Sequence, residues 1–382
     1  MNHRLLLRRR CLPLSALLGL MLAAPLASQQ LHTYQERDFL TRIRRLTVEG
    51  KRAGEGYWSS DGKRLVFQSE REPGNPFYQI YTVDLASGDT KRISSGIGKT
   101  TCAFFRPAPG DPGGSVEIEF ASTHADPRSK QLQVEELAFR ASGKERRYSW
   151  DYDPEMDIYA YNEKTGATRR LTTTRGYDAE GSYSPDGQWI VFTSMRDAYS
   201  RPLNDKEKKM LEENPSYFAD IYIMRADGSG QKRLTNVPGY DGGPFFTPDG
   251  SRIVWRRFDE AGLLADVWTM KPDGSDQKQI TDFGSMSWAP YMHPSSEYII
   301  FSSNKLGFEN FELFIVDAQG TKEPVRVTYS DGFDGLPVPS PDGKTLAWTS
   351  SRSGGAAGQL FLAQWDHEKA LEAIRNAPLR KK

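Results

Sequence analysis

Short runs of alternating apolar and polar residues recur along the whole chain. One set follows an Asp-Gly turn or a close variant and covers residues 64–69, 189–194, 252–257, 298–303 and 345–350. A second set, with the pattern Asp-Ile-Tyr or a variant of it, occurs six times, at residues 79–84, 157–162, 220–225, 266–271, 312–317 and 359–364. Period-2 alternation of β-branched and aromatic residues over about six positions predicts strands.

These runs belong to a longer repeat. The phrase Gly-aromatic-Asp, followed by Ser/Thr-Pro-Asp-Gly, occurs without a gap at residues 176–187, 239–250 and 332–343. An Arg-Leu-Thr-like segment ends each unit, at Thr47, Ser94, Thr172, Thr235, Thr281 and Thr328. The last three are 46 and 47 residues apart. Self-similarity at this period, with four short strands in each unit, is typical of propeller blades.

The turns and the ends of the array fit this architecture. Asp-Gly supplies the positive φ that a tight hairpin needs, so Pro-Asp-Gly joins the first strand of a unit to the second. The last repeat stops after its third strand near Trp365, whereas residues 44–48 form an Arg-Leu-Thr strand with no repeat before it. We therefore predict an all-β, six-bladed propeller of four-stranded blades over residues 40–366, closed by an N-terminal strand that removes the open edge.

The repeat phrases resemble the WD40-like (PD40) repeats of the TolB propeller family. The blades of that family carry Ser-Pro-Asp-Gly, then an Ile-Tyr-x-Met-Asn-like strand, then Arg-Leu-Thr. The resemblance covers residues 40–366 and does not include the α/β domain that precedes the propeller in TolB. It implies the fold and says little about function, because such propellers serve many roles.

The N-terminal segment predicts export. Arg8, Arg9 and Arg10 precede an apolar stretch and small residues, the pattern of a secretory signal peptide over residues 1–28. Its removal leaves 46 basic and 50 acidic residues, a balance that argues against a nucleic-acid partner. Only Cys102 remains, so no internal disulfide is expected. We expect a periplasmic or secreted monomer without a transmembrane segment, ending in a helix and a basic tail over residues 367–382.

Candidate catalytic and metal motifs are sparse. No Gly-x-Ser-x-Gly or His-Glu-x-x-His occurs, and the histidines that follow the signal lie in four separate segments. We therefore predict no catalytic residue, no metal site and no cofactor. One acidic cluster leaves calcium binding open against a solvated loop, since carboxylates are ligands of this hard cation: Asp151, Asp153, Glu155 and Asp157.

Two insertions place the candidate binding face. Residues 124–155 and 197–217 both lie between the second and third strands of their blades, so they share the face that surrounds the channel mouth. Residues 205–213 in the second insertion predict a short helix that begins after the N-cap Asn204.

Candidate ligand-binding residues border the same mouth: Glu55, Asp178, Glu180, Asp241, Trp288 and Asp334, with Arg71, Arg196 and Arg352 at the ends of second strands. Two interpretations stay open. The aspartates form an acidic ring that faces a ligand, or they pair with the arginines and cap their own turns. Trp288 is either a core residue or a recognition platform.

Two functions follow. The first is a non-catalytic binding scaffold that holds an envelope protein, peptide or glycan at the insertion-bearing rim. The alternative is a hydrolase or lyase at the channel mouth, acting on glycan or peptide, in which Glu180 and Asp241 act as acid and base, or a stand-alone relative of the propellers that accompany peptidases.

Overall fold

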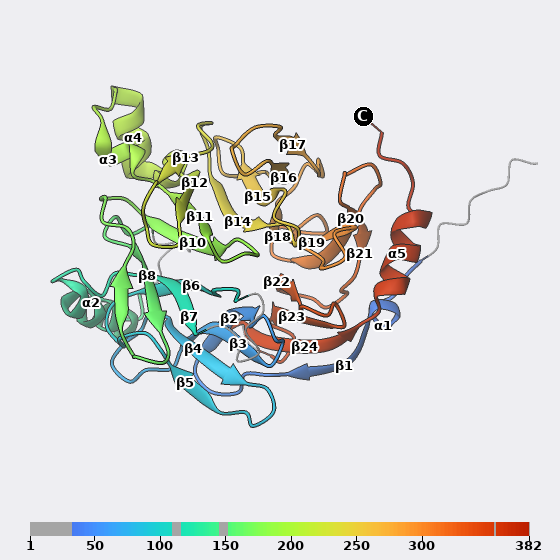
Figure 1. The fold of residues 1–382 in the computed structure, drawn as a ribbon, viewed down its shortest axis with the longest axis horizontal. Helices are drawn as coiled ribbons and strands as arrows, with labels where there is room; N and C mark the ends of the chain where they lie inside the picture. The colour runs from blue at the N-terminus through green and yellow to red at the C-terminus, as the bar shows by residue number, and fades with distance from the viewer. Residues whose placement is uncertain (1–32, 109–115, 145–151, 355–356, 382) are drawn as a thin grey trace, which may run out of the picture. The chain divides into compact units, whose positions relative to one another are not determined.

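The computed structural model describes residues 33–108, 116–144, 152–354 and 357–381. Within this part of the chain, 24 strands form six four-stranded antiparallel sheets (Figure 1). The innermost strand of each sheet contacts the innermost strand of the next, so the six sheets form a closed ring. The predicted six-bladed propeller is confirmed.

The blades follow one another along the chain. Blade 1 contains β2 (Arg52–Trp58), β3 (Arg64–Glu70), β4 (Gln79–Asp84) and β5 (Thr90–Arg92), and blade 2 contains β6 (Thr100–Phe105), β7 (Glu117–Ser122), β8 (Asp157–Asn162) and β9 (Thr168–Arg170). Blade 3 contains β10 (Asp178–Tyr183), β11 (Trp189–Ser194), β12 (Asp220–Arg225) and β13 (Lys232–Arg233), and blade 4 contains β14 (Asp241–Phe246), β15 (Ile253–Phe258), β16 (Ala265–Met270) and β17 (Lys278–Gln279). Blade 5 contains β18 (Ser287–Met292), β19 (Tyr298–Ser303), β20 (Glu312–Asp317) and β21 (Val325–Arg326). Blade 6 contains β22 (Asp334–Pro339), β23 (Thr345–Ser350), β24 (Gln359–Trp365) and β1 (Leu40–Arg45).

The ring is closed by the N-terminal strand, as predicted. Strand β1 runs antiparallel to β24, with Leu40 opposite Trp365. The strand begins earlier than the predicted residues 44–48, because α1 (Glu36–Phe39) delivers Phe39 and Leu40 into the core beside blade 6. The Arg-Leu-Thr segment still bonds to β24, since the Leu46 amide donates to the Leu360 carbonyl at 2.7 Å.

The repeated Ser/Thr-Pro-Asp-Gly turn has a structural explanation. In blade 3, the backbone amides of Gln188 and Trp189 donate to the Asp186 carboxylate at 3.0 Å and to the Ser184 hydroxyl at 2.9 Å. The hydroxyl and the carboxylate therefore satisfy backbone donors that the hairpin leaves free. The same arrangement occurs at Ser59, Thr247 and Ser340.

The Arg-Leu-Thr motif ties the fourth strand to the third. In blade 3, the Thr235 hydroxyl donates to Asp220 at 3.0 Å and accepts from the Ile221 amide at 2.9 Å, while Arg233 pairs with the same carboxylate at 2.5 Å. Blades 2 and 5 repeat this arrangement at Asp157 and Glu312. The motif therefore stabilises these three blades.

The helices between α1 and α5 (His367–Asn376) lie in the two insertions. They are α2 (Ser129–Ala141) in blade 2, and α3 (Asp197–Ser200), α4 (Asp205–Glu213) and the 3-10 helix η1 (Pro215–Phe218) in blade 3; α5 follows β24. Asn204 caps α4 as predicted, because its side chain accepts from the Glu207 amide at 2.9 Å.

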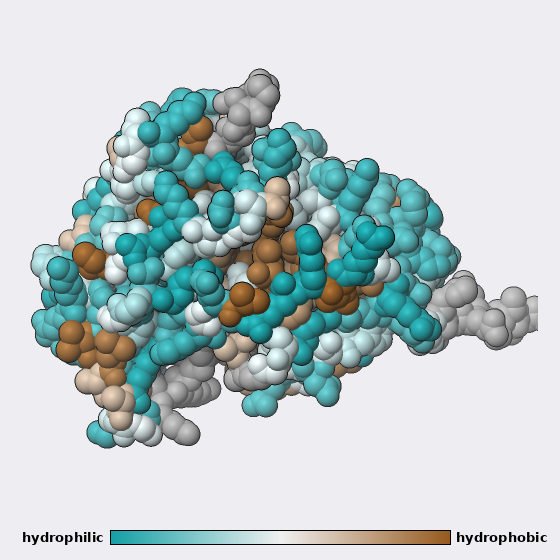
Figure 2. Space-filling model, turned by 90° about the horizontal axis from the view of Figure 1, so that it is seen from below, coloured by the Kyte–Doolittle hydropathy of each residue, from teal (hydrophilic) through white to brown (hydrophobic). Residues whose placement is uncertain are grey.

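Large apolar side chains are mostly buried between blades. On the face seen in Figure 2 hydrophilic residues predominate, with apolar residues gathered near its middle. None of the described helices is long and apolar enough to cross a membrane. The predicted signal peptide, residues 1–28, lies outside the described residues.

Candidate binding site at the channel mouth

The innermost strand of every blade carries a β-bulge at the same register. The first residue of each bulge has a positive φ, between 49° and 57°: Glu55, Cys102, Glu180, Gly243, Ala289 and Leu336. Five of the six are not glycine, so a conformation that is strained for a residue with a side chain is retained all around the ring. Bulges re-aim side chains at functional sites. We call these six positions the bulge ring.

A cavity of about 1020 Å³ opens at this ring, and all six bulge-ring residues line it. Both insertions also reach it, through Tyr152 of blade 2 and through Glu213, Asn214 and Ser216 of blade 3. Its volume is that of the larger ligand pockets in proteins. The predicted binding face therefore contains a cavity large enough for a ligand.

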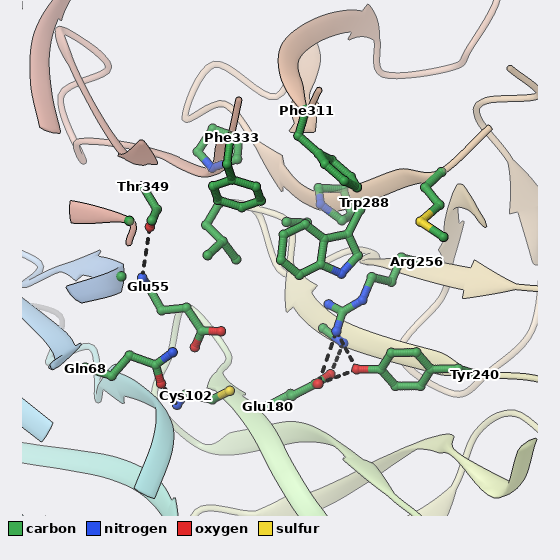
Figure 3. Close-up of a pocket in the computed structure, with 18 of the residues that line it drawn as sticks. Glu55, Gln68, Cys102, Glu180, Tyr240, Arg256, Trp288, Phe311, Phe333 and Thr349 are labelled. Carbon is green, nitrogen blue, oxygen red and sulfur yellow. Dashed lines mark hydrogen bonds and ion pairs between the residues drawn. The ribbon is translucent and has the colours of Figure 1, made fainter. Parts of the chain in front are cut away.

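One side of the cavity holds a buried ion pair (Figure 3). The Glu180 carboxylate accepts from the Gly243 amide at 2.6 Å, from the Thr193 hydroxyl at 3.1 Å and from Arg256 at 3.1 Å, and the Tyr240 hydroxyl also bonds to it. A Cβ at Gly243 would lie 1.9 Å from an Arg256 nitrogen, so a side chain here would displace the guanidinium from its position beside Glu180. The bulge-ring residue of blade 4 is therefore a glycine, and the Arg256 side chain occupies the space beside it.

Glu55 differs from Glu180 in that none of the described residues forms an ion pair with it, and Cys102 alone hydrogen-bonds to its carboxyl. It is 8% exposed, and its Oε2 atom has no hydrogen-bond partner. Burial raises the pKa of Glu55 to about 7; the Cys102 thiol beside it lowers this pKa, and the negative charge of Glu180 raises it. The pKa of Cys102 is raised as well, chiefly by burial. Glu55 is therefore a buried carboxyl that changes charge near neutral pH.

The side of the cavity that faces Glu55 is aromatic (Figure 3). Trp288 packs edge-on against Phe311 and Phe333 at ring-centroid distances of 6.2 and 6.1 Å, and the two phenylalanines are 5.7 Å apart. The Arg256 guanidinium lies 5.4 Å from the centroid of the Trp288 ring. Figure 3 places the Glu55 carboxyl across the open space from Trp288 and Phe333.

We expect Glu55→Gln to stabilise the protein at pH 8 by roughly 3 kcal/mol. The folded-state pKa of about 7 lies above the ordinary value of 4.5, so folding favours the protonated acid and wild-type stability falls as pH rises from 4.5 to 7. Glutamine carries no such dependence. Urea unfolding at pH 5 and pH 8 checks this, with exposed Glu309→Gln as control. A Glu55→Gln variant no more stable than wild type at pH 8 would contradict it.

Three of the predicted ligand-binding residues line the cavity: Glu55, Glu180 and Trp288. The three predicted aspartates do not. Asp178, Asp241 and Asp334 are at most 1% exposed. Arg196 and Arg352 bond to Asp178 and Asp334 at 2.6 and 2.7 Å, and Arg257 forms two 2.7 Å bonds to Asp241. These contacts favour the second interpretation, with Arg196 and Arg352 as predicted partners and Arg257 as a partner that was not predicted.

The predicted arginines have structural partners. Arg71 lies 3.4 Å from Glu49 and not near an aspartate, because Ala53 stands in blade 1 where Asp178 stands in blade 3. Sequence reasoning missed Cys102, Arg256, Tyr240, Phe311 and Phe333 at the cavity. Cys102 had a signal, since it is at the same repeat position as Glu55 and Glu180.

The acidic cluster of blade 2 is separated into individual pairs. Asp153 bonds to Lys99 at 2.7 Å, Glu155 lies 3.5 Å from Arg175, and Asp157 bonds to Arg170; Asp151 lies outside the described residues. In the described part of the chain no three His, Cys, Asp or Glu side chains come together as a metal site would require. Calcium binding by this cluster stays a prediction.

Sequence comparisons give partial matches. No family model matches the chain. It is 30% identical over 218 residues to an uncharacterized protein of Agrobacterium fabrum, which covers 53% of this chain and 64% of that protein. It is 24% identical over 157 residues to the uncharacterized peptidase YuxL of Bacillus subtilis, covering 38% and 22%. The chain thus matches less than two thirds of the length of these relatives.

Solved structures share the fold. A structure assigned as TolB from Agrobacterium tumefaciens superimposes with a TM-score of 0.54 at 20% identity, over 82% of this chain and 90% of that one. TolB from Acinetobacter baumannii superimposes with a TM-score of 0.51 at 17% identity, over 83% of this chain and 64% of that one. Oligogalacturonate lyase from Vibrio parahaemolyticus superimposes with a TM-score of 0.51 at 12% identity, over 88% of this chain and 97% of that one. The chain has the propeller fold that TolB proteins and this lyase share.

Proposed function

Starting from this TolB-like propeller fold, we propose that the protein is a binding protein that holds a segment of a peptide or protein ligand in the channel-mouth cavity. One observation carries the proposal. Six bulges place their residues around one cavity, which combines an aromatic wall with the buried Glu55 carboxyl, whose Oε2 atom lacks a hydrogen-bond partner. Apolar walls with a few convergent polar groups are typical of ligand sites.

The insertions favour a polypeptide ligand. Residues of both insertions line the cavity, and the blade 4 and blade 6 loops add Ala261, Gly262 and Gly358. The outer parts of the neighbouring loops carry exposed apolar side chains, including Leu263 at 63% and Phe308 at 74% exposed. A ligand that enters the cavity and continues over these loops buries both surfaces, which a small molecule does not.

The enzymatic alternative required a free carboxyl pair at the mouth. Glu180 is held by four donors, and both Asp241 oxygens are bonded by Arg257, with Trp255 also donating at 3.2 Å. A general acid or base must reach the substrate with an available oxygen. The geometry therefore favours binding over acid and base roles for this pair.

The experiment is affinity capture from an envelope extract with wild type and two variants. Ala289→Trp fills the cavity at a bulge-ring position, and Asp273→Asn changes an exposed carboxyl in the turn between β16 and β17. We expect wild type and Asp273→Asn to retain one protein or peptide that Ala289→Trp loses, with all three proteins folded by circular dichroism. Equal capture by all three would show that the ligand binds elsewhere.

We also propose that the protein is exported, on the strength of the pattern in residues 1–28. The mature chain is expected to begin between residues 28 and 30 and to occur in the periplasm or the medium. N-terminal sequencing of the protein from its native cells, after fractionation, checks both points. Recovery of a cytoplasmic chain that retains Met1 would contradict the proposal.

A further inference from the structure

Glu55 is the one charged residue lining the cavity for which no ion pair is found within the described part of the chain. Arg256 pairs with Glu180, Arg52 bonds to Glu70 at 2.9 Å, and Glu213 lies 3.8 Å from Lys209. Glu55 is more than nine-tenths buried, and its Oε2 atom lacks any partner. The site thus contains one acid whose charge the protein itself does not neutralise.

A buried carboxylate without an ion-pair partner is unfavourable unless a cation binds beside it. The cavity is built to hold a cation with an apolar body. Trp288, Phe311 and Phe333 present aromatic surface across from Glu55, and aromatic faces attract organic cations. Arg256 occupies part of this surface but is already neutralised by Glu180. One negative charge is left for the ligand.

We infer that the cavity recognises a primary ammonium group on an apolar or peptide body, with Glu55 as its counter-ion and the Trp288 cluster as its apolar contact. This inference rests on the proposed function and names the group that anchors the ligand. Two sources carry this chemistry in a polypeptide, the free amino terminus and the lysine side chain. A free amine is a third source.

The pH dependence follows from the groups around Glu55. The titratable and charged groups that interact with it come from four blades: Tyr57, Cys102, Glu180 and Arg256. Because burial holds the pKa of Glu55 at about 7, the acid is mostly neutral at pH 5.5 and mostly ionised at pH 8. Preference for an ammonium over a neutral group of the same shape is therefore expected to grow as pH rises over this interval.

The test uses calorimetric titration of the purified full chain with matched probes. The pair 2-phenylethylamine and 2-phenylethanol differs in the ammonium alone. We expect the amine to bind about tenfold or more tightly at pH 7.5 and the difference to shrink at pH 5.5. Glu55→Gln should bring the ratio to about one while the alcohol keeps its affinity, and the exposed Glu309→Gln should leave the ratio unchanged.

Two peptides distinguish the sources. One is a free-amino tetrapeptide of alanine and phenylalanine, and the other is its acetylated form with a lysine in place of one alanine. Tighter binding of the first assigns an amino terminus, and tighter binding of the second assigns a lysine side chain. Amine and alcohol that bind equally would overturn the ammonium inference and leave the cavity as a binding site. A second outcome would overturn both the ammonium inference and the proposed binding site. In it, none of the probes displaces the captured ligand, and each binds Ala289→Trp as tightly as wild type.

Discussion

A chain that begins at Leu46 is expected not to fold into a stable monomer. It lacks β1, and its loss exposes the hydrogen-bonding edge of β24. It also lacks Phe39, which is fully buried and stacks on Trp365 at 6.1 Å. Truncating one buried phenylalanine costs about 3–5 kcal/mol, against a total stability of about 5–15 kcal/mol for a typical domain. Loss of a whole strand exceeds that margin.

Thermal unfolding followed by circular dichroism, with size-exclusion chromatography, checks this. A chain that begins at Tyr34 is the control and should melt cooperatively as a monomer. Phe39→Ala in that chain should lose about 3–5 kcal/mol, and a synthetic peptide of residues 34–48 should restore a cooperative transition to the short chain. A short chain that melts like the control would mean that β1 does not close the ring.

Replacing Asp241 by asparagine is expected to cost about 3–5 kcal/mol, because it leaves the Arg257 charge without its partner in a buried site. Asp241 is 1% exposed and forms two 2.7 Å bonds with Arg257, whose guanidinium also lies 4.7 Å from the Trp268 ring centroid. A ligand-facing carboxylate would instead cost little stability on replacement. The magnitude therefore separates the two interpretations of the aspartates.

The matched control is Asp276→Asn in the same blade. Asp276 also bonds to an arginine, Arg252, at 2.8 Å, but its side chain is 36% exposed. An exposed pair contributes about 0–1 kcal/mol, so this variant should unfold nearly as wild type does. Urea denaturation at pH 7 measures both. A loss for Asp241→Asn no larger than for Asp276→Asn would contradict a structural role for the buried pair.

The fold was predictable because its signals are local. Turn residues such as Asp186 and threonines such as Thr235 bond within their own blade, so each leaves a mark at a fixed distance in the sequence. The closing strand was predicted for the same reason, since Thr47 repeats the role of Thr235. Its start was misplaced, because Phe39 and Leu40 are held by tertiary packing that no repeat records.

The site was predictable only in part, because its members come from different blades. Glu55 and Glu180 were found since they share a repeat position. Arg256 was not found from the sequence. Its side chain reaches the cavity because Gly243, on the neighbouring strand β14, has no side chain in its way, and no single repeat position records this pair. The aspartates were left with two interpretations, a ligand-facing ring or pairing with arginines. The sequence does not show whether their carboxylates are buried or exposed.

A crystal structure of the chain from residue 34 to 382, soaked with 2-phenylethylamine at pH 7.5, tests the central claim most directly. The account predicts density for the amine in the channel-mouth cavity, with its nitrogen about 2.8 Å from a Glu55 carboxylate oxygen and its ring against Trp288 or Phe333. Density for the amine only at sites outside the cavity, with the cavity itself unoccupied, would contradict the account.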